Sequence, residues 1–196
     1  MPFCYRYTPI NEQNADIFTE PRQDYRGKPL KPLTGPARLD STDIAILAAL
    51  QREGRLPVVE LARKVNLSAT PCTLRLRRLE QEGVIAGYRA LIAPVALGLS
   101  LVVFVEVKLK SSDEASLEAF NRAIRPVPEV LECHMVGGGF DYLIKARVRD
   151  MTHYRELLGG VIGALPMVEG TRSYFVMQEV KDSGPLPIPK PHRHRR

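Results

Sequence analysis

Three arginines lie close together in a stretch that has the length and composition of a helix. Between residues 70 and 79 the chain has Arg75, Arg77 and Arg78 and no acidic residue. Guanidinium groups form bidentate hydrogen bonds with phosphates and with the edges of guanine. Solvated surface helices usually mix charges of both signs, whereas here the nearest acids follow at the C-terminal end, where they do not favour the helix dipole. The spacing therefore indicates a helix that binds a polyanion.

The predicted helix has clear ends and one apolar face. Ser68 is suited to the N-cap position, Pro71 falls in the first turn, where its missing N–H costs little, and Gly83 is a typical C-terminal stop. Three residues share the apolar face: Cys72, Leu76 and Leu79. The other faces are left for a ligand, and the residues expected to contact it are Ser68, Thr70, Pro71, Thr73, Leu74, Arg75, Arg77 and Arg78.

Two amphipathic helices precede this one. Residues 39–54 are predicted to form the first, with the inward residues Ile44, Leu47 and Leu50. Residues 57–65 are predicted to form the second, with the inward residues Leu61, Ala62 and Val65. Asn66 then stands in the turn, where its side chain tolerates a left-handed backbone. A helix, a short turn and a cationic helix are typical of a helix-turn-helix, whose second element enters the major groove of double-stranded DNA.

Composition and charge agree with a polyanionic partner. The 196-residue chain has a net charge of +6. Residues 39–95 have 8 basic and 6 acidic side chains, whereas residues 96–182 have 10 and 12, so the C-terminal half is not expected to be a second DNA surface. The whole chain has 3 cysteines, and their spacing fits neither a metal site nor a redox motif, which indicates a reducing compartment. There is no bilayer-length apolar run and no signal peptide, so we expect a cytoplasmic protein without membrane contact.

The chain divides into an extended arm at 1–38, a helix-turn-helix domain at 39–92, a connector at 93–98, a second domain at 99–182 and a basic, proline-rich tail at 183–196. The arm contains 6 prolines and no helical or strand periodicity, so it is expected to be disordered. Residues 84–92 are predicted to form a strand. In the tail, His192 and His194 allow metal binding, but a solvated tail with general affinity for phosphates is the favoured interpretation.

Apolar residues at every second position predict a sheet in the second domain. The predicted strands are 99–109, 130–136, 142–149 and 171–180, and the predicted helices are 113–125 and 150–165, the latter with inward residues Tyr154, Leu157, Leu158, Val161 and Leu165. This β-α-β-β-α-β order predicts a ferredoxin-like α+β fold. One face of the sheet would be open and would carry Val102, Phe104, Leu131 and Leu143. A second copy of the chain is expected to cover that apolar face, which predicts a homodimer.

Three features of the sequence contain residue types found in enzyme sites, but the spacing of these residues excludes a catalytic or nucleotide-binding role. The glycines at 137–139 follow a strand, but no helix opens after them and no Gly-Lys-Ser/Thr follows, so they form neither a P-loop nor a dinucleotide fingerprint. Cys133 and His134 are neighbours on a strand and point to opposite faces. His153 begins a helix without an acid at a useful spacing. We therefore expect no enzyme activity, no metal site and no resident cofactor.

Several motifs together resemble the Lrp/AsnC, or leucine-responsive regulatory protein, family of bacterial and archaeal transcription regulators. They are Leu67-Ser-x-Thr-Pro-Cys followed by Arg-x-Arg-Arg-Leu-Glu, Gly87-Tyr88-Arg-Ala-Leu, Glu132-Cys-His134, Phe140-Asp-Tyr142 and Thr171-Arg-Ser-Tyr-Phe-Val-Met177. The resemblance covers residues 39–181. It implies an N-terminal winged helix-turn-helix, a C-terminal effector-binding and assembly domain, and dimers that associate further, often to octamers. It also implies an amino-acid effector at the contact between dimers.

On this resemblance, the effector site lies around the loop at 137–142. Glycines leave its backbone N–H groups open to an α-carboxylate, and Asp141 offers an acceptor for an α-ammonium. The expected effector-binding residues are Gly137, Gly138, Gly139, Asp141, Tyr142, Thr171 and Ser173. Spacing alone favours the alternative, a glycine-rich hairpin turn in which Asp141 caps the backbone. Gly139 stands where the family usually has aspartate, which predicts weaker binding or a different side-chain preference.

The sequence thus predicts a sequence-specific DNA-binding transcription regulator that responds to an amino acid and controls amino-acid metabolism. Leu74 stands where relatives often have a polar side chain, so the base preference is expected to differ, for instance through contact with a thymine methyl. The alternative is a nucleoid-organising protein that wraps DNA with low sequence preference and binds no effector. The ratio of the affinities for operator and non-operator DNA, measured at one salt concentration, distinguishes the regulator from the nucleoid-organising protein.

Overall fold

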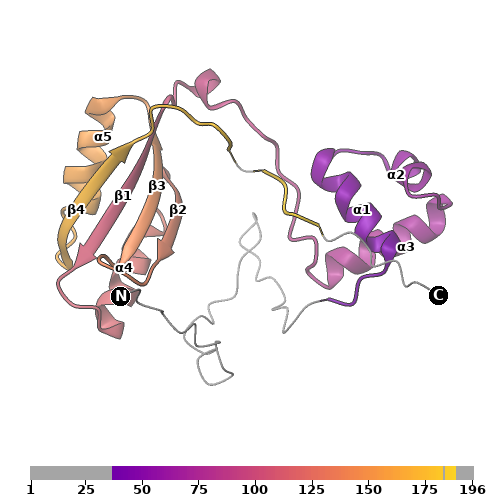
Figure 1. Cartoon of the computed structure of the whole chain (residues 1–196), viewed down its shortest axis with the longest axis horizontal. Coiled ribbons are helices and arrows are strands. Elements are labelled where there is room, and N and C mark those ends of the chain that lie inside the picture. The colour runs from indigo at the N-terminus through magenta and orange to yellow at the C-terminus, as the bar shows by residue number, and fades with distance from the viewer. Residues whose placement is uncertain (1–36, 183, 189–196) are drawn as a thin grey trace, which may run out of the picture. The chain divides into compact units, whose positions relative to one another are not determined.

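The computed structural model describes residues 37–182 and 184–188. They form two compact units, one comprising the described residues up to Ala90 together with 184–188, and the other running from Leu91 to Asp182. Figure 1 shows a helical first unit and a second unit built on a sheet. The predicted arm, except for its last two residues, lies outside the described residues, as does the part of the predicted tail that contains His192 and His194.

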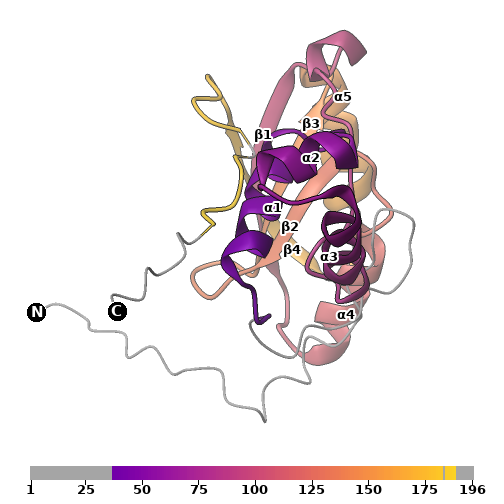
Figure 2. The ribbon, with the colours of Figure 1, turned by 90° about the vertical axis from the view of Figure 1, so that its right-hand side faces the viewer.

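The first unit is a bundle of α1 (Ser41–Arg52), α2 (Val58–Lys64) and α3 (Ala69–Gln81), seen from the side in Figure 2. The three predicted helices are therefore confirmed. Their shared core consists of Ile46, Leu56, Leu61, Ala62, Cys72 and Leu79. In α1 the prediction of inward residues was partly wrong: Ile46 is fully buried, Leu47 and Leu50 lie at the edge of the core, and Ile44 lies outside it.

A capping box begins α1. Asp40 Oδ1 accepts hydrogen bonds from the N–H groups of Thr42 (2.9 Å) and Asp43 (2.8 Å), and Asp43 Oδ2 accepts one from the N–H of Asp40 (3.2 Å). These bonds satisfy donors that the first helical turn leaves without intrahelical partners. The box also fixes the Asp43 carboxylate at the start of α1, next to α3.

In the segments that flank α3, the predicted left-handed residues are confirmed, whereas the predicted side-chain cap and the predicted strand are not. Asn66 (φ 56°) and Gly83 (φ 75°) have the left-handed backbone expected of them. Ser68 stands at the N-cap of α3, but its side chain makes no capping hydrogen bond. The predicted strand at 84–92 is wrong, because these residues pair with no strand in the part of the chain that the structure describes, and Leu91 is 87% exposed. An isolated extended segment has no ladder hydrogen bonds to hold it as a strand.

The second unit has the predicted ferredoxin-like order. It consists of β1 (Leu101–Leu109), α4 (Glu114–Ile124), β2 (Val130–Met135), β3 (Tyr142–Val148), α5 (Met151–Leu157) and β4 (Val168–Phe175), preceded by a 3₁₀ turn at Pro94–Leu97 inside the predicted connector. The antiparallel sheet has the strand order β2-β3-β1-β4, and α4 and α5 cover one of its faces (Figure 1).

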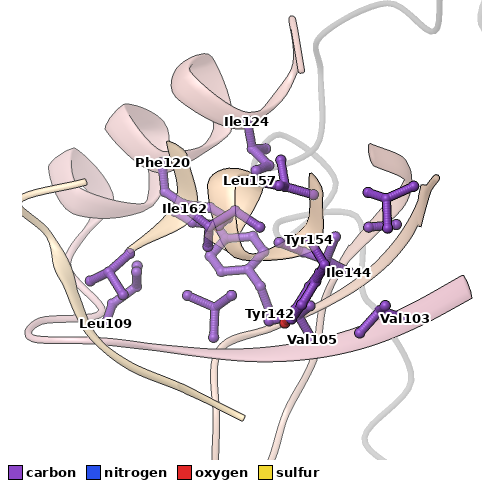
Figure 3. Close-up of a cluster of buried hydrophobic side chains, with 14 residues drawn as sticks. Val103, Val105, Leu109, Phe120, Ile124, Tyr142, Ile144, Tyr154, Leu157 and Ile162 are labelled. Atoms are coloured by element: carbon purple, nitrogen blue, oxygen red, sulfur yellow. The ribbon is translucent and has the colours of Figure 1, made fainter. Parts of the chain in front are cut away.

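The core of this unit lies between the sheet and its two helices (Figure 3). Alternate residues of β1 and β3 face the helices, as the period of two predicted, and are buried: Val103, Val105, Val107, Leu109, Tyr142, Ile144, Ala146 and Val148. From α4, Phe120 packs against Tyr142 with ring centroids 4.3 Å apart. Offset aromatic pairs of this kind add stability beyond their buried area.

The end of α5 departs from prediction. The helix was expected to continue to residue 165 with Val161 inward, but it changes at Leu158–Ile162 into a π-helical turn. A π-turn contains one residue more than an α-turn. The residues after it therefore point to different sides than in a continuous α-helix, by one position along the chain. Ile162 is therefore fully buried and Val161 is 36% exposed.

The last strand lies earlier in the chain than expected, at 168–175 instead of 171–180. After β4, Val176 N–H still donates to Val102 C=O (3.0 Å), but residues 177–182 and 184–188 have no strand pairing. Glu179 instead pairs with Arg147, and Asp182 Oδ1 lies 3.1 Å from Lys145 Nζ. Residues 176–182 thus lie across part of the sheet face that the helices leave open.

The open face is also less apolar than predicted. Val102 is buried, and Phe104 and Leu143 are half-buried, among the charged residues Glu106, Lys108, Lys145 and Arg147 on the same face. Leu131 does not belong to this face in regular alternation, because the register between β2 and β3 shifts between Val130 and Glu132. The prediction that this apolar face is left open was therefore partly wrong, since the chain's own C-terminal segment and charged side chains occupy part of it.

Candidate nucleic-acid interface and effector loop

The predicted DNA-contact residues lie on α3 and at its N-terminus. Five of them are exposed, Ser68, Thr70, Leu74, Arg77 and Arg78, and three are half-buried, Pro71, Thr73 and Arg75. Leu74 is 63% exposed, which leaves its methyl groups open to apolar contact with a thymine methyl. Thr73 Oγ1 donates a hydrogen bond to the Ala69 carbonyl (2.8 Å), so this hydroxyl already has a partner within the helix.

Two of the three arginines are held by acids of α1. Arg75 Nη1 lies 2.5 Å from Asp40 Oδ2 and 2.8 Å from Asp43 Oδ1. Arg78 Nη2 lies 2.5 Å from Asp43 Oδ2, and Arg78 Nε lies 4.0 Å from Glu82 Oε2. The Asp43 side chain is only 1% exposed, so these guanidinium groups replace the water that would otherwise stabilise its charge.

The prediction of an arginine face without acids is therefore wrong for Arg75 and Arg78. The acids were missed because they lie 32 and 35 residues earlier in the chain, where helical spacing within α3 gives no signal. Arg77 is exposed and, within the part of the chain that the structure describes, has no ion-pair partner. Arg77 is thus the arginine of α3 whose whole charge is available to DNA.

The pairs also shift protonation equilibria at the helix junction. The N–H of Asp43, followed by the guanidinium of Arg75, lowers the pKa of Asp40 from its usual 3.8, although partial burial opposes the shift. The Asp40 and Asp43 carboxylates in turn raise the pKa of Arg75. Asp40 and Arg75 are therefore both charged at neutral pH, and the ion pair between them persists there.

The predicted effector residues do not form one cluster. Asp141 Oδ2 accepts the N–H of Leu109 (2.8 Å), its Oδ1 accepts Ser112 Oγ–H (2.7 Å), and Lys108 Nζ lies 3.2 Å away. Burial opposes ionisation of Asp141, but these donors outweigh it and lower its pKa. These contacts join Asp141 to the end of β1 and to the residues just after it, so they are not the local cap within the hairpin turn that the alternative interpretation expected.

Two other predicted effector residues point toward the helix-covered side of the sheet. The Tyr142 side chain is in the core, and its hydroxyl donates to the Leu117 carbonyl (3.4 Å). Ser173 Oγ shares a short hydrogen bond with the hydroxyl of Tyr154 on α5. Neither side chain faces the open side of the sheet, and their assignment as effector residues stays a prediction.

Gly139 and Thr171 do line a surface depression of about 470 Å³. The depression is also lined by Glu106, Lys108, Phe140, Gly170 and Arg172. Glu106 accepts a hydrogen bond from Tyr174 (2.9 Å) and lies 4.0 Å from Arg172 Nη1. Sequence reasoning missed the charged residues of this depression, although the alternation along β1 already places Glu106 and Lys108 on its open face. Gly137 and Gly138 are exposed in the same loop but do not line the depression.

Cys133, His134 and His153, the side chains considered for enzyme chemistry, do not form a catalytic group with one another. Burial raises the pKa of the Cys133 thiol to about 11, and Cys133 and His134 face opposite sides of β2, as predicted. His153 was expected to lack a partner acid, which is wrong: its Nε2 lies 3.2 Å from Glu129 Oε1. Within residues 37–182 and 184–188, no three His, Cys, Asp or Glu side chains are grouped to hold a metal ion. Nor does any helix in this range have the length and apolarity to cross a membrane.

The first unit contains a helix-turn-helix, formed by α2 and α3, with an exposed arginine on α3. It is joined to a separate ferredoxin-like unit. This combination is typical of two-domain DNA-binding transcription regulators. The sequence matches the models for a winged helix-turn-helix DNA-binding domain over residues 39–86 and for the Lrp/AsnC ligand binding domain over residues 102–186.

Individual relatives cover both units. The chain is 49% identical over 146 residues to the proline dehydrogenase transcriptional activator of Rhizobium radiobacter, covering 74% of this chain and 94% of that protein. It is 51% identical over 150 residues to the leucine-responsive regulatory protein of Escherichia coli (strain K12), covering 76% and 92%. A crystal structure of a transcriptional regulator from Neisseria meningitidis in complex with L-Met matches with a TM-score of 0.73 and 38% identity, covering 76% and 96%.

The chain therefore belongs to the Lrp/AsnC family of DNA-binding transcription regulators, and it is not an enzyme. The predicted family, fold class and DNA-binding function are confirmed.

Proposed function

We propose that this protein regulates genes of amino-acid metabolism by binding specific DNA sequences through α3 and by responding to a free amino acid in its second unit. It acts in the cytoplasm, where the chromosome is accessible, as a homodimer that associates further, up to an octamer. The amino acid is its effector, and no resident cofactor is required.

The surface of α3 supports sequence-specific binding. Leu74 and Arg77 are three residues apart and therefore neighbours on the helix, and both are exposed. An arginine can bind guanine with two hydrogen bonds, and a leucine can contact the methyl group of thymine. Together they would read adjacent bases, while Ser68 and Thr70 at the helix N-terminus bind phosphates.

The charged depression supports an amino-acid effector, and this observation carries the proposal. A free amino acid has one carboxylate and one ammonium group. Lys108 and Arg172 offer cations for the carboxylate, and Glu106 offers an anion for the ammonium group. Thr171 and the backbone of Gly139 add a hydroxyl and a backbone donor at the same place. The names of relatives suggest leucine, methionine and proline as the first effectors to test.

Calorimetric titration with the twenty amino acids tests this proposal. Arg172→Gln removes one cation of the depression, and Arg122→Gln is a matched control because both arginine side chains are 74% exposed and each lies near one acid. We expect one or a few amino acids to bind the wild type and the control, and to bind Arg172→Gln at least about tenfold more weakly, the loss of one charged contact. If no amino acid binds the wild type below millimolar concentration, the second unit serves assembly alone.

A further inference from the structure

A buried carboxylate lies at the junction of α1 and the DNA-contacting helix α3. Asp43 accepts hydrogen bonds from the N–H of Asp40 (3.2 Å), from Arg75 Nη1 (2.8 Å) and from Arg78 Nη2 (2.5 Å). Its side chain is 1% exposed, and all buried side-chain N and O atoms in the described residues have hydrogen-bond partners. The carboxylate is therefore held from both helices and is out of reach of a DNA phosphate.

The two arginines keep part of their hydrogen-bonding capacity. A guanidinium group has five N–H donors in a planar fork. Arg75 directs Nη1 toward the two acids, and its side chain remains 31% exposed. Arg78 directs Nη2 toward Asp43, and its side chain remains 43% exposed. Each guanidinium thus binds the protein along one edge and has other donors at the surface of α3.

We infer that Asp43 is a positioning residue for DNA recognition: it fixes the guanidinium groups of Arg75 and Arg78 in one orientation on α3 before DNA arrives. A long side chain that is free in solution loses rotamer entropy when it binds, which weakens binding. Here that entropy is lost when the two helices fold together. DNA then meets donors that already have the orientation set by the protein. The inference rests on DNA binding through α3.

A masking role for the same acids is the opposite interpretation. It would require DNA phosphates to displace Asp43 from the arginines. The hydrogen bond from Asp40 N–H and the burial of Asp43 oppose such a displacement, because the carboxylate would lose its partners without gaining water. Since both arginine side chains remain partly exposed and each guanidinium has five N–H donors, DNA can bind them without displacing the acid.

The test compares Asp43→Asn with wild type on two DNA duplexes by fluorescence anisotropy. One duplex is selected by the wild-type protein from random sequence, and the other has the same base composition in scrambled order. Asparagine keeps the size of the side chain and an acceptor oxygen but removes the charge that orients both arginines. Glu53→Gln is the control, because it removes one negative charge that pairs with Lys64 of α2 and not with an arginine of α3.

For Asp43→Asn we expect at least about a tenfold loss of affinity for the selected duplex and less than about a twofold change for the scrambled duplex, because non-specific binding needs charge without fixed orientation. The control is expected to match wild type on both. The wild-type preference for the selected duplex is measured first, so failure of sequence-specific binding is distinguished from failure of this inference.

Two further variants separate positioning from general stability. Asp40→Asn keeps the N-cap, since asparagine caps as well as aspartate, yet weakens the hold on Arg75 alone, and about a threefold loss for the selected duplex is expected. The double variant Asp43→Asn, Arg78→Ala should bind the selected duplex less than about tenfold more weakly than Arg78→Ala, because Asp43 then acts through Arg75 alone. Equal losses on both duplexes, unchanged affinities, or tighter binding of the selected duplex by the Asp variants would each overturn the inference.

Discussion

Arg147 Nη2 on β3 lies 2.7 and 2.6 Å from the two carboxylate oxygens of Glu179, which is 32 residues later in the chain. The Arg147 side chain is 8% exposed and the Glu179 side chain 33%. This pair fastens residues 176–182 to the sheet face that the helices leave open. It explains why that face is partly covered within a single chain.

Removing this acid should destabilise the second unit. Within the described residues, Glu179→Ala leaves the buried guanidinium of Arg147 with only the Leu99 carbonyl (3.3 Å) as a hydrogen-bond partner. We expect a loss of about 1–3 kcal/mol, below the cost for a fully buried pair because Glu179 is partly exposed. Urea denaturation measures it. Glu118→Ala, which removes an exposed partner 3.8 Å from Arg122, is the control and should change stability little.

The π-helical turn after α5 makes a prediction at two adjacent residues. Ile162→Ala should cost about 2–5 kcal/mol because it opens a cavity in the core, whereas Val161→Ala should cost less than about 1 kcal/mol. A continuous α-helix, as the sequence pattern indicated, would reverse this order. Equilibrium unfolding of the two variants decides between them.

Asp141 should make stability depend on pH. Its pKa is lower in the folded chain than the usual 3.8, so the stabilisation is complete above 3.8 and is lost as the pH falls through the lower, folded-state pKa. Asp141→Asn should therefore be less stable than wild type at pH 7, and the difference should shrink as the pH falls below 3.8. Thermal melts from neutral to acidic pH measure the difference. The exposed Glu156→Gln is the control, and a pH-independent difference for Asp141→Asn would contradict the account.

The open face of the sheet also tests the proposed assembly. Phe104→Asp would place a carboxylate without a partner at the contact between two sheets, which costs several kcal/mol. Light scattering after size-exclusion chromatography should show smaller species or aggregates. Val59→Asp, on the exposed surface of α2, should keep the wild-type size. A Phe104→Asp protein that also keeps the wild-type size would exclude this face as the dimer contact.

Local patterns predicted most elements, because alternation and helical spacing express burial directly. The alternate residues of β3 from Tyr142 to Val148 are all buried as expected, and a Pro-x-Val sequence precedes both β2 and β4. Contacts between distant residues could not be predicted in this way. The pairs of Asp43 with Arg75 and Arg78, and of Glu129 with His153, join side chains that no sequence spacing connects.

The candidate sites were predicted incompletely for the same reason, because contacts between distant residues determine which side chains are available to a ligand. Helical spacing identified the exposed residues of α3 correctly, but it could not show that two of its arginines are held by acids. The family resemblance led to Asp141, Tyr142 and Ser173 as effector residues, whereas their hydrogen bonds involve the backbone and the hydroxyl groups of the fold itself. Glu106 and Lys108 lie on β1 and Arg172 lies on β4, and only the pairing of these two strands brings the three side chains to one depression.

DNA affinity of Arg77→Ala tests the central claim most directly. Arg77 is exposed, lies off the core-facing side of α3, and has no ion-pair partner among the described residues, so its removal should leave the fold intact. The exposed Arg155 on α5, outside the helix-turn-helix, supplies the control variant Arg155→Ala. The measurement is the affinity of both variants for a duplex selected by the wild type, at one fixed salt concentration. A loss of about 1–3 kcal/mol for Arg77→Ala, with Arg155→Ala unchanged, is the predicted result. Wild-type affinity in Arg77→Ala would contradict the assignment of α3 as the helix that reads DNA.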